Sequence, residues 1–107
     1  MEHRKPTEDE IKLLDILISK SNKHINIDWK SKILIKPLKD GNMVSFEIFP
    51  EGKIIYDRAF GNQISEFIFK DLDGVDVITS LNTDKNGNLY ELDIWKVDYT
   101  PLKKINV

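Results

Sequence analysis

The sequence predicts an α+β fold in which an N-terminal helix packs on a five- or six-stranded, mainly antiparallel meander sheet. Three observations lead to this class: an amphipathic stretch with helical spacing near the N-terminus, a change to alternating apolar and polar residues after it, and short turn sequences between the alternating runs. The chain has 107 residues and shows neither a linker nor a repeat. We therefore expect a single domain, 1–107, with a helix at about 7–21, strands within about 32–98 and a tail at 99–107.

The helix is indicated by its first residues and by its apolar stripe. Thr7 and Glu10 match a capping box, in which each side chain bonds the backbone N–H of the other residue. Apolar residues then recur three and four positions apart, namely Ile11, Leu13, Leu14, Leu17 and Ile18. We expect this stripe to lie in the core.

Alternation with a period of two follows the helix, and glycine, proline and asparagine mark the turns. In chain order we expect a strand from Lys32 to Ile35 ending near Pro37, a turn at 39–42, a strand at 44–49, a turn at 50–53 and a third strand starting at Ile54-Ile55-Tyr56. Trp29, near the start of the first strand, is expected in the core. Residues 57–65 fit a loop or a bent strand, and this choice stays open. A strand around Phe67 and Phe69 then leads to a tight turn at 72–74.

The last hairpin can be derived in more detail. Residues 75–82 and 89–97 flank Asn86-Gly87, a pair favoured at the centre of a type I′ turn because both positions need a positive φ. With these two residues at the centre, Lys85 pairs with Asn88. The cross-strand pairs that follow are Val77 with Lys96, Ile78 with Trp95, Thr79 with Ile94, Ser80 with Asp93, Leu81 with Leu92 and Asn82 with Glu91.

This register gives the hairpin two different faces, because successive side chains of a strand point to opposite sides. One face is apolar and suited to pack under the helix, and it carries Val77, Leu81, Tyr90, Leu92 and Ile94. The other is acidic with a tryptophan in the middle, and it carries Ile78, Ser80, Asn82, Glu91, Asp93 and Trp95.

Composition excludes several classes of site. The chain has no cysteine, which excludes a disulfide framework, a thiolate zinc site and a cysteine nucleophile. His3 and His24 are the only histidines, and neither has metal partners at ligand spacing. Because no nucleophile is paired with a base, we expect a protein that is not an enzyme. No apolar run reaches 18 residues, so no membrane span is expected.

Charge is distributed unevenly along the chain, although the net charge is only −2. Residues 1–39 carry nine basic and six acidic residues, a net of +3, whereas residues 40–107 carry seven and twelve, a net of −5. An acidic half disfavours nucleic acid as the ligand, since phosphate binding needs a basic surface, and it favours a basic protein partner. The N-terminus lacks the apolar segment of a secretion signal, so we expect a cytoplasmic protein.

Asp76, Glu91, Asp93 and Trp95 form the candidate partner-binding site. Tryptophan is enriched at the energetic centres of protein interfaces, and flanking carboxylates would steer a basic partner. Two other interpretations stay open. The acids can be a solvated face or hold neighbouring loop amides, or Glu91 and Asp93, two residues apart on a strand and roughly 6–7 Å from each other, can act as a catalytic pair.

Residues Asn82 to Asp93 partly match the spacing of a calcium-binding loop. The first position is Asn, however, the twelfth is Asp instead of Glu, and the flanks are predicted strands instead of helices. The hairpin turn accounts for these residues, and we expect no metal and no cofactor.

The last third of the chain carries an unusual pattern. It consists of Asp71-Leu72-Asp73-Gly74-Val75, Leu81, Asp84, Gly87, Leu89, Glu91-Leu92-Asp93, Trp95-Lys96, Asp98 and Pro101-Leu102. This pattern resembles a family of small bacterial domains of unknown function, and the resemblance implies no particular activity. By size, charge and fold class the chain is also similar to the immunity proteins of bacterial toxin systems, which are non-catalytic, cytoplasmic and shaped to block basic nuclease toxins.

These observations together predict a protein-binding domain, an immunity protein that occludes the active site of a nuclease-type toxin with Trp95 as the anchor. The alternative is a small regulatory or scaffold module, in which Glu91, Asp93 and Trp95 would be largely buried and bonded to each other. A carboxylate-dependent enzyme would need a concave pocket around the two acids. The sequence leaves the partner and the oligomeric state open.

Overall fold

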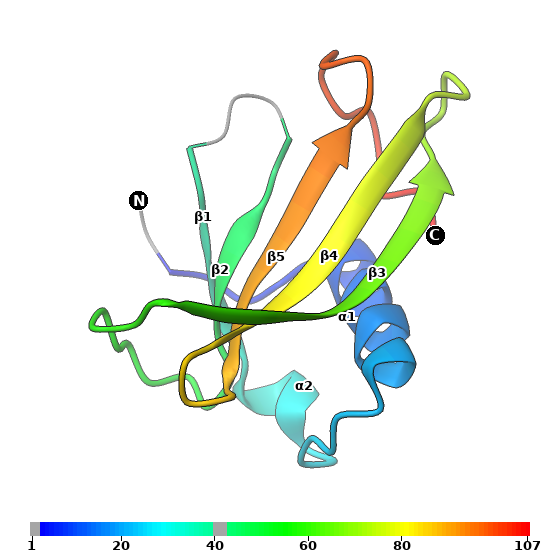
Figure 1. Ribbon diagram of the computed structural model, residues 1–107. Helices are drawn as coiled ribbons and strands as arrows, with labels where there is room; N and C mark the ends of the chain where they lie inside the picture. Colours follow the sequence, from blue (N-terminus) through cyan, green and yellow to red (C-terminus); the bar gives the residue numbers. More distant parts are fainter. Residues whose placement is uncertain (1–2, 40–42) are drawn as a thin grey trace.

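The computed structural model describes residues 3–39 and 43–107, and this part of the chain forms two helices and five strands (Figure 1). They are α1 (Glu8–Ser21), α2 (Trp29–Lys32), β1 (Leu34–Pro37), β2 (Phe46–Phe49), β3 (Phe60–Lys70), β4 (Asp76–Asp84) and β5 (Leu89–Lys96). The strands pair antiparallel in the order β1-β2-β5-β4-β3. The predicted α+β class, an N-terminal helix with an antiparallel sheet, is confirmed.

Helix α1 begins and ends as the sequence predicts. The Thr7 hydroxyl accepts the Glu10 N–H at 3.2 Å, and the Glu10 carboxylate accepts the Thr7 N–H at 2.7 Å, which completes the capping box. Asn22 ends the helix in the left-handed conformation, with a φ of 59°. The apolar stripe faces the core, with only Ile11 at its margin.

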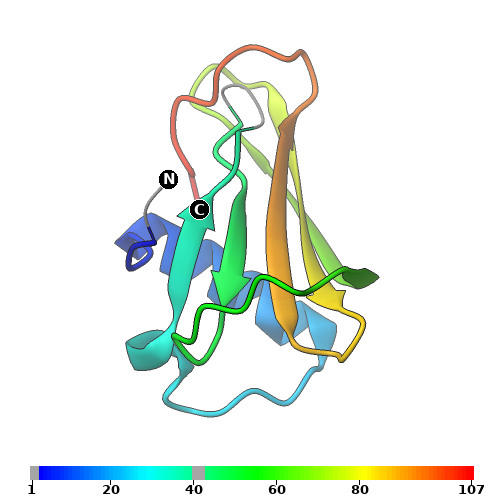
Figure 2. The ribbon, with the colours of Figure 1, turned by 90° about the vertical axis from the view of Figure 1, so that its left-hand side faces the viewer.

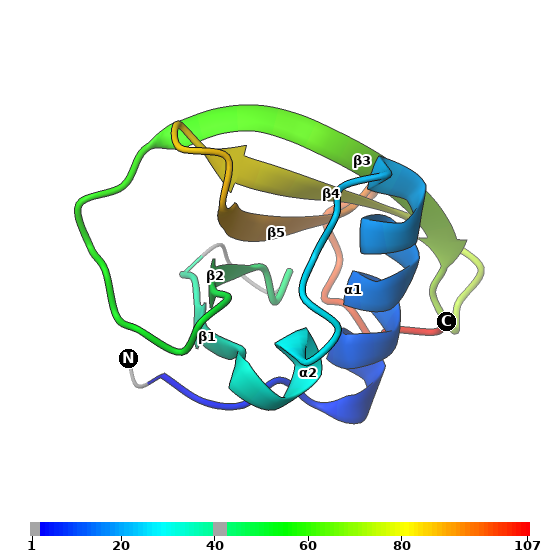
Figure 3. The same ribbon diagram turned by 90° about the horizontal axis from the view of Figure 1, so that it is seen from below.

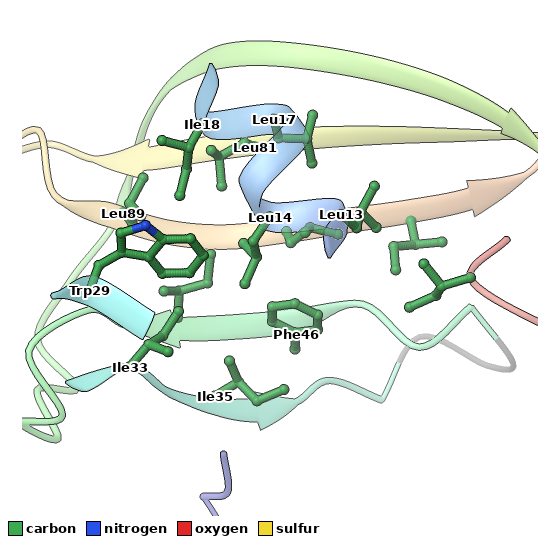
Figure 4. Close-up of a cluster of buried hydrophobic side chains, with 14 of the residues drawn as sticks. Leu13, Leu14, Leu17, Ile18, Trp29, Ile33, Ile35, Phe46, Leu81 and Leu89 are labelled. Carbon is green, nitrogen blue, oxygen red and sulfur yellow. The ribbon is translucent and has the colours of Figure 1, made fainter. Parts of the chain in front are cut away.

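The core lies between α1 and one face of the sheet. Seen from below, the sheet curves around α1 and α2, which lie on its concave side (Figure 3), and the side view shows α1 behind the sheet (Figure 2). Figure 4 shows Leu14 of α1, Trp29 of α2 and Phe46 of β2 pointing into this layer. The buried apolar cluster consists of Leu13, Leu14, Leu17, Ile18, Trp29, Ile33, Ile35, Phe46, Ile48, Phe69, Val77, Leu81, Leu89, Leu92, Ile94 and Ile105.

The strand order differs from a simple meander in one place. β2 pairs with β5 instead of with β3, the next strand along the chain. The turn at 50–53 is present, since the Gly52 N–H donates to the Phe49 carbonyl at 3.0 Å, but it opens into a long connection through residue 59 that crosses the end of the sheet. Arg58 holds this connection by donating to the carbonyl oxygens of Ile48 at 2.7 Å and Leu89 at 3.1 Å. As a result, β3 forms the far edge of the sheet beside β4.

The first predicted strand begins too early. Residues Trp29–Lys32 form the short helix α2, and β1 starts at Leu34. The Ile33 N–H donates to the Trp29 carbonyl at 3.0 Å, which closes this single turn and brings the Trp29 ring into the core. The burial of Trp29 therefore agrees with the prediction. Its secondary structure does not, because Trp29 lies in a short helix and not near the start of a strand.

The expected strand at Ile54-Ile55-Tyr56 is absent, and these residues lie exposed in the connection between β2 and β3. A run of β-branched residues becomes a strand only where a neighbouring strand can bond its backbone. Here the segment passes across the end of the sheet and meets none. The open stretch 57–65 divides at Phe60: residues 57–59 belong to the loop, and the strand that follows is irregular, with register shifts between Phe60 and Asn62 and between Gln63 and Ser65.

The second strand is shorter than expected. Val44 has a φ of 59° and lies outside β2, which starts at Phe46. Phe49 alternates with Ile48 and so falls on the same side of the strand as Glu47, yet it is buried, because the guanidinium of Arg58 lies 4.8 Å from its ring centre. Residues 40–42 of the predicted turn at 39–42 lie outside the described residues.

The hairpin of β4 and β5 has the predicted register. All six cross-strand pairs, from Val77 with Lys96 to Asn82 with Glu91, are confirmed. Val77, Leu81, Leu92 and Ile94 of the predicted inner face are buried in the core, and the acidic face points away from it. Tyr90 was expected on the inner face, but it is half-buried outside the core cluster, because it lies in the bulge and packs against the guanidinium of Arg58.

The turn of this hairpin is not the predicted type. The Gly87 N–H donates to the Asp84 carbonyl at 3.0 Å, and the Asp84 N–H donates to the Asn88 carbonyl at 2.8 Å. The expected pairing of Lys85 with Asn88 is therefore wrong, and three residues close the turn instead of two. The pairing then shifts by one residue between Asn82 and Thr83, and this bulge restores the expected register.

Neither helix in the described part of the chain is both long enough and apolar enough to cross a bilayer.

Candidate protein-binding face of the sheet

Strand alternation brings the four predicted site residues onto one face. Glu91, Asp93 and Trp95 lie two residues apart along β5, so their side chains share the outer face of the sheet. Trp95 faces Ile78 on β4, and Asp76, two residues before Ile78, lies on the same outer face. The predicted grouping on one face is therefore present.

An exposed apolar row crosses the middle of this face. Ile68 of β3 pairs with Ile78 of β4, which pairs with Trp95 of β5, so three apolar side chains stand side by side across the strands. Trp95 is 41% exposed and Ile68 is 50% exposed. Tyr99 extends the row beyond β5, with its ring centre 5.9 Å from that of Trp95. We call Ile68, Ile78, Trp95 and Tyr99 the apolar row.

Charged residues stand on both sides of the apolar row. On one side, Glu66 of β3 and Asp93 of β5 flank Ser80 in the same cross-strand line. On the other side, the Asp76 carboxylate accepts from Lys70 Nζ at 2.8 Å, and both side chains are exposed. Asp76 is thus partly neutralised by a neighbour.

The two carboxylates of the E-L-D sequence have different surroundings. One Glu91 oxygen accepts from the Asn82 amide at 3.1 Å, in a half-buried position. Asp93 is exposed and accepts from the Ser45 hydroxyl at 3.3 Å. Three surface hollows formed by the described residues are lined by other side chains. The two acids therefore lie on the outer face of the sheet, away from these three hollows.

The other half of the unusual C-terminal pattern forms a buried polar cluster. Lys96 points inward, and its Nζ donates to Asp71 at 2.9 Å, to Asp73 at 2.6 Å and to the Pro101 carbonyl at 3.3 Å. Both members of the Lys96–Asp71 pair have side chains with no exposed surface. Asp71 also accepts the backbone N–H groups of Lys103 at 2.8 Å and of Lys104 at 3.1 Å.

This cluster, which we call the C-terminal clip (Asp71, Asp73, Lys96 and the tail residues 101–104), ties the tail to the turn between β3 and β4. Burial disfavours the charged form of Asp71, but the Lys103 N–H, the Lys96 ammonium and two further amides outweigh it and lower the pKa of Asp71 to about 2. For Lys96 likewise, burial opposes the charge, and the bonds to Asp73 and Asp71 nevertheless raise its pKa. Asp71 and Lys96 of the clip are therefore charged at neutral pH, and their bonds stabilise the fold.

The scaffold alternative predicted Glu91, Asp93 and Trp95 to be buried and bonded to each other. Asp93 and Trp95 are exposed, and it is their neighbour Lys96 that is buried and bonded. The reason is the alternation of β5, which sends Trp95 outward and Lys96 inward. In the unusual C-terminal pattern, Lys96 therefore stabilises the fold, whereas Asp93 and Trp95 are exposed.

The partial calcium-loop spacing has a structural explanation. Asp84 Oδ1 accepts the backbone N–H groups of Asn86 at 2.9 Å and Asn88 at 3.0 Å, so its carboxylate closes the hairpin turn. Among the described residues, no group of three or more histidine, aspartate or glutamate side chains could hold a metal ion.

Sequence reasoning missed Ile68, Tyr99 and Arg58. Ile68 could have been found, because the turn at 72–74 sets the register of β3 on β4 and so places Ile68 beside Ile78. No sequence signal of this kind indicated Arg58 or Tyr99. Arg58 lies in the connection between β2 and β3 and Tyr99 in the tail after β5, and the path of both segments depends on the whole fold.

The fold and the face define a small α+β domain with a helix behind an antiparallel sheet and an exposed aromatic and acidic outer face. The chain belongs to the family described as Domain of unknown function (DUF6984), whose model matches residues 3–106. The resemblance to a family of unknown function is thereby confirmed, and it extends over nearly the whole chain. No curated protein and no solved structure matches the chain significantly.

Proposed function

We propose that this protein is a non-catalytic protein-binding domain whose outer sheet face docks a basic partner. The single observation that supports this most is the apolar row, in which Trp95 and Ile68 of the sheet and Tyr99 of the tail are exposed, with Glu66 and Asp93 beside them. Exposed apolar patches rimmed by polar residues are typical of protein interfaces. Trp95 would be the anchor, because burying a large aromatic ring contributes most to the binding free energy.

The carboxylates would select the partner. Asp93 and Glu66 lie next to the apolar row, so lysine or arginine side chains of a partner can pair with them while its apolar surface covers Trp95. Asp76 contributes less in this arrangement, since Lys70 already pairs with it at 2.8 Å. Glu91 lies further along β5 and would complete the acidic margin.

In its more specific form, the proposal is an immunity protein that acts in the cytoplasm and occludes the active site of a nuclease-type toxin. Nucleases present basic surfaces to nucleic acid, and an acidic sheet face is complementary to such a surface. The competing interpretation is a regulatory or scaffold module that uses the same face on a different partner.

The test is site-specific photocrosslinking followed by affinity measurement. A photoreactive phenylalanine analogue at position 95, and a control at the fully exposed Ile27, would be used in lysate of the native host. We expect a basic protein that crosslinks from position 95 and not from position 27. With that protein purified, Trp95→Ala should weaken binding by about 30-fold, whereas Ile27→Ala should have no effect.

Charge variants distinguish the electrostatic attraction of the partner from the contact that Trp95 makes with it. Asp93→Lys should slow association and reduce its dependence on salt, and the matched reversal at exposed Asp57, Asp57→Lys, should not. An affinity for Trp95→Ala within twofold of the wild type would refute the site. A crosslinked partner without toxic activity when expressed alone would refute the immunity role and leave the docking face in place.

A further inference from the structure

A second feature lies at the opposite end of β5 from Trp95. The loop after α1, the connection between β2 and β3, and the β4–β5 turn surround a hollow of about 280 Å³, which we call the basal pocket. In Figure 1 these segments lie together at the lower end of the sheet. The volume is close to the lower limit of about 300 Å³ for sites that bind small molecules.

The basal pocket has an apolar interior. Phe49 and Leu89, both buried, form part of its lining, and Ile25 and Ile55 contribute from the two loops. Such a surface suits the apolar body of a small ligand and does not by itself select its charge.

The polar groups of the pocket are mainly hydrogen-bond donors. Lys23 and His24 come from the loop after α1, and Lys53 comes from the connection between β2 and β3. Within the described residues, the side chains of these three make no hydrogen bond and no ion pair. Two chain segments thus bring unpaired donors to one hollow.

Arg58 supplies a further donor. Its side chain is only 7% exposed, and its terminal nitrogens are bonded to Glu47, to Ile48 and to Leu89. Its Nε is buried and has no hydrogen-bond partner. The rings of Phe49 and Tyr90 lie 4.8 and 4.9 Å from the centre of the guanidinium. An unpaired buried N–H is rare in native proteins and calls for an acceptor.

The carboxylates that line the pocket are already engaged. Glu51 pairs with Lys32 at 3.5 Å, and Asp84 accepts the amides of its own turn. Asp84 also lies 3.8 Å from Arg58 Nη1. Among the charged side chains that the structure describes in the lining, the cations Lys23 and Lys53 are therefore unpaired while both carboxylates have partners, and the amides of Asn26 and Asn88 complete the polar lining.

We propose that the basal pocket binds a small organic carboxylate with a compact apolar body. The carboxylate would accept hydrogen bonds from Lys53, Lys23 and His24 at the rim of the pocket, with Arg58 beneath them. The apolar body of the ligand would pack on Phe49 and Leu89. This site is independent of the docking face, because it lies at the other end of β5.

The test uses benzoate as the probe and benzamide as its neutral counterpart, followed by amide chemical shifts of the whole chain. Benzoate should shift the amides of residues 23–26, 53–58 and 89 in a saturable way at millimolar concentrations, and benzamide should bind at least fivefold more weakly. Equal binding of the two probes, or tighter binding of inorganic phosphate, would refute a carboxylate site.

Variants locate the site. Lys53→Glu should weaken benzoate binding by at least fivefold, whereas the same change at exposed Lys12 on α1, Lys12→Glu, should not. Ile55→Trp should fill the pocket and abolish binding, and Ile27→Trp is its control. Ile55 and Ile27 are exposed, so both variants should fold, and unchanged benzoate binding by Ile55→Trp would overturn the proposal.

Discussion

Arg58 fixes the longest connection of the sheet through several contacts at once. Its guanidinium donates to Glu47 at 2.8 Å and to two backbone carbonyls, and it stacks between the rings of Phe49 and Tyr90. Planar, forked donors can serve all of these partners together, and a lysine ammonium cannot.

We predict that Arg58→Lys lowers the free energy of unfolding by about 2–3 kcal/mol, since it keeps the charge but leaves carbonyl oxygens unpaired. Urea unfolding measures this. Lys39→Arg, at an exposed position, is a control that should leave the free energy of unfolding unchanged. If Arg58→Lys lowered the free energy of unfolding by less than about 0.5 kcal/mol, the connection would not depend on the guanidinium of Arg58.

Asp71 makes the stability depend on pH in the acid range. Its pKa is about 2 in the folded protein, below the value of about 3.9 that an aspartate has when unfolded. A lowered folded pKa means that the unfolded state binds protons more readily, so the contribution of Asp71 is fully present above about pH 4–5 and is lost as the pH falls through 2.

We therefore predict that the midpoint of thermal unfolding falls steadily between about pH 5 and pH 2, and that part of this fall disappears in Asp71→Asn. At neutral pH, Asp71→Ala should cost about 3–5 kcal/mol, because it removes the buried one of the two carboxylates that hold Lys96 and leaves the amides of Lys103 and Lys104 without their acceptor. If the pH profiles of the wild type and Asp71→Asn ran parallel, Asp71 would not be the group responsible.

At the scale of elements, the turns of the β3–β4 and β4–β5 hairpins follow one rule. In both, an aspartate comes first and a glycine with positive φ comes fourth, as in Asp71–Gly74 and Asp84–Gly87. In each turn the glycine N–H donates to the aspartate carbonyl, at 2.9 and 3.0 Å. This is the pattern of a type I turn followed by a bulge, and it outweighed the preference of Asn86-Gly87 for a two-residue turn.

We predict different costs for two glycine substitutions near this turn. Gly87 has a φ of 83° with open space around it, so Gly87→Ala should cost only about 1 kcal/mol of backbone strain. Gly61 of β3 lies against the Asp84 carbonyl, which an added Cβ would strike, so Gly61→Ala should cost at least twice as much. Denaturant unfolding of the two variants checks the order, and equal losses would contradict it.

The sequence predicted α1 almost to the residue, because the capping box and the apolar stripe act within a few residues of each other. The register of β4 and β5 was predicted for a similar reason: the apolar set can face only one side of the sheet. The α2 turn and the loop at Ile54 were not predicted. The alternation at Ile54 fits a strand, and the lack of a neighbouring strand decides against it. In α2, the bond from the Ile33 N–H to the Trp29 carbonyl closes a helical turn and brings Trp29 into the core.

At the scale of the whole molecule, the C-terminal tail is part of the fold. Ile105 lies in the core, and the amides of Lys103 and Lys104 together with the Pro101 carbonyl complete the clip around Asp71 and Lys96.

We predict that ending the chain after Asp98 lowers the midpoint of thermal unfolding by about 15 °C or more. Loss of a buried isoleucine and of hydrogen bonds to charged groups amounts to about 4 kcal/mol, and each kcal/mol corresponds to about 4–8 °C in a domain of this size. Calorimetry is the measurement. Removal of residues 106–107 alone should have a far smaller effect, and a similar loss for both truncations would argue against the clip.

The sequence by itself determined the class of fold, the extent of the helix, the register of β4 and β5 from Val77–Lys96 to Asn82–Glu91, and the grouping of Asp93 and Trp95 on one face. Each of these depends on neighbours in the chain or on the period of a strand. Only the tertiary structure decided which strand lies beside β5, where Arg58 and Tyr99 lie, and that Lys96 is buried against Asp71 while Trp95 stays exposed. Those features depend on contacts between residues far apart in the chain, and local propensity carries no information about them.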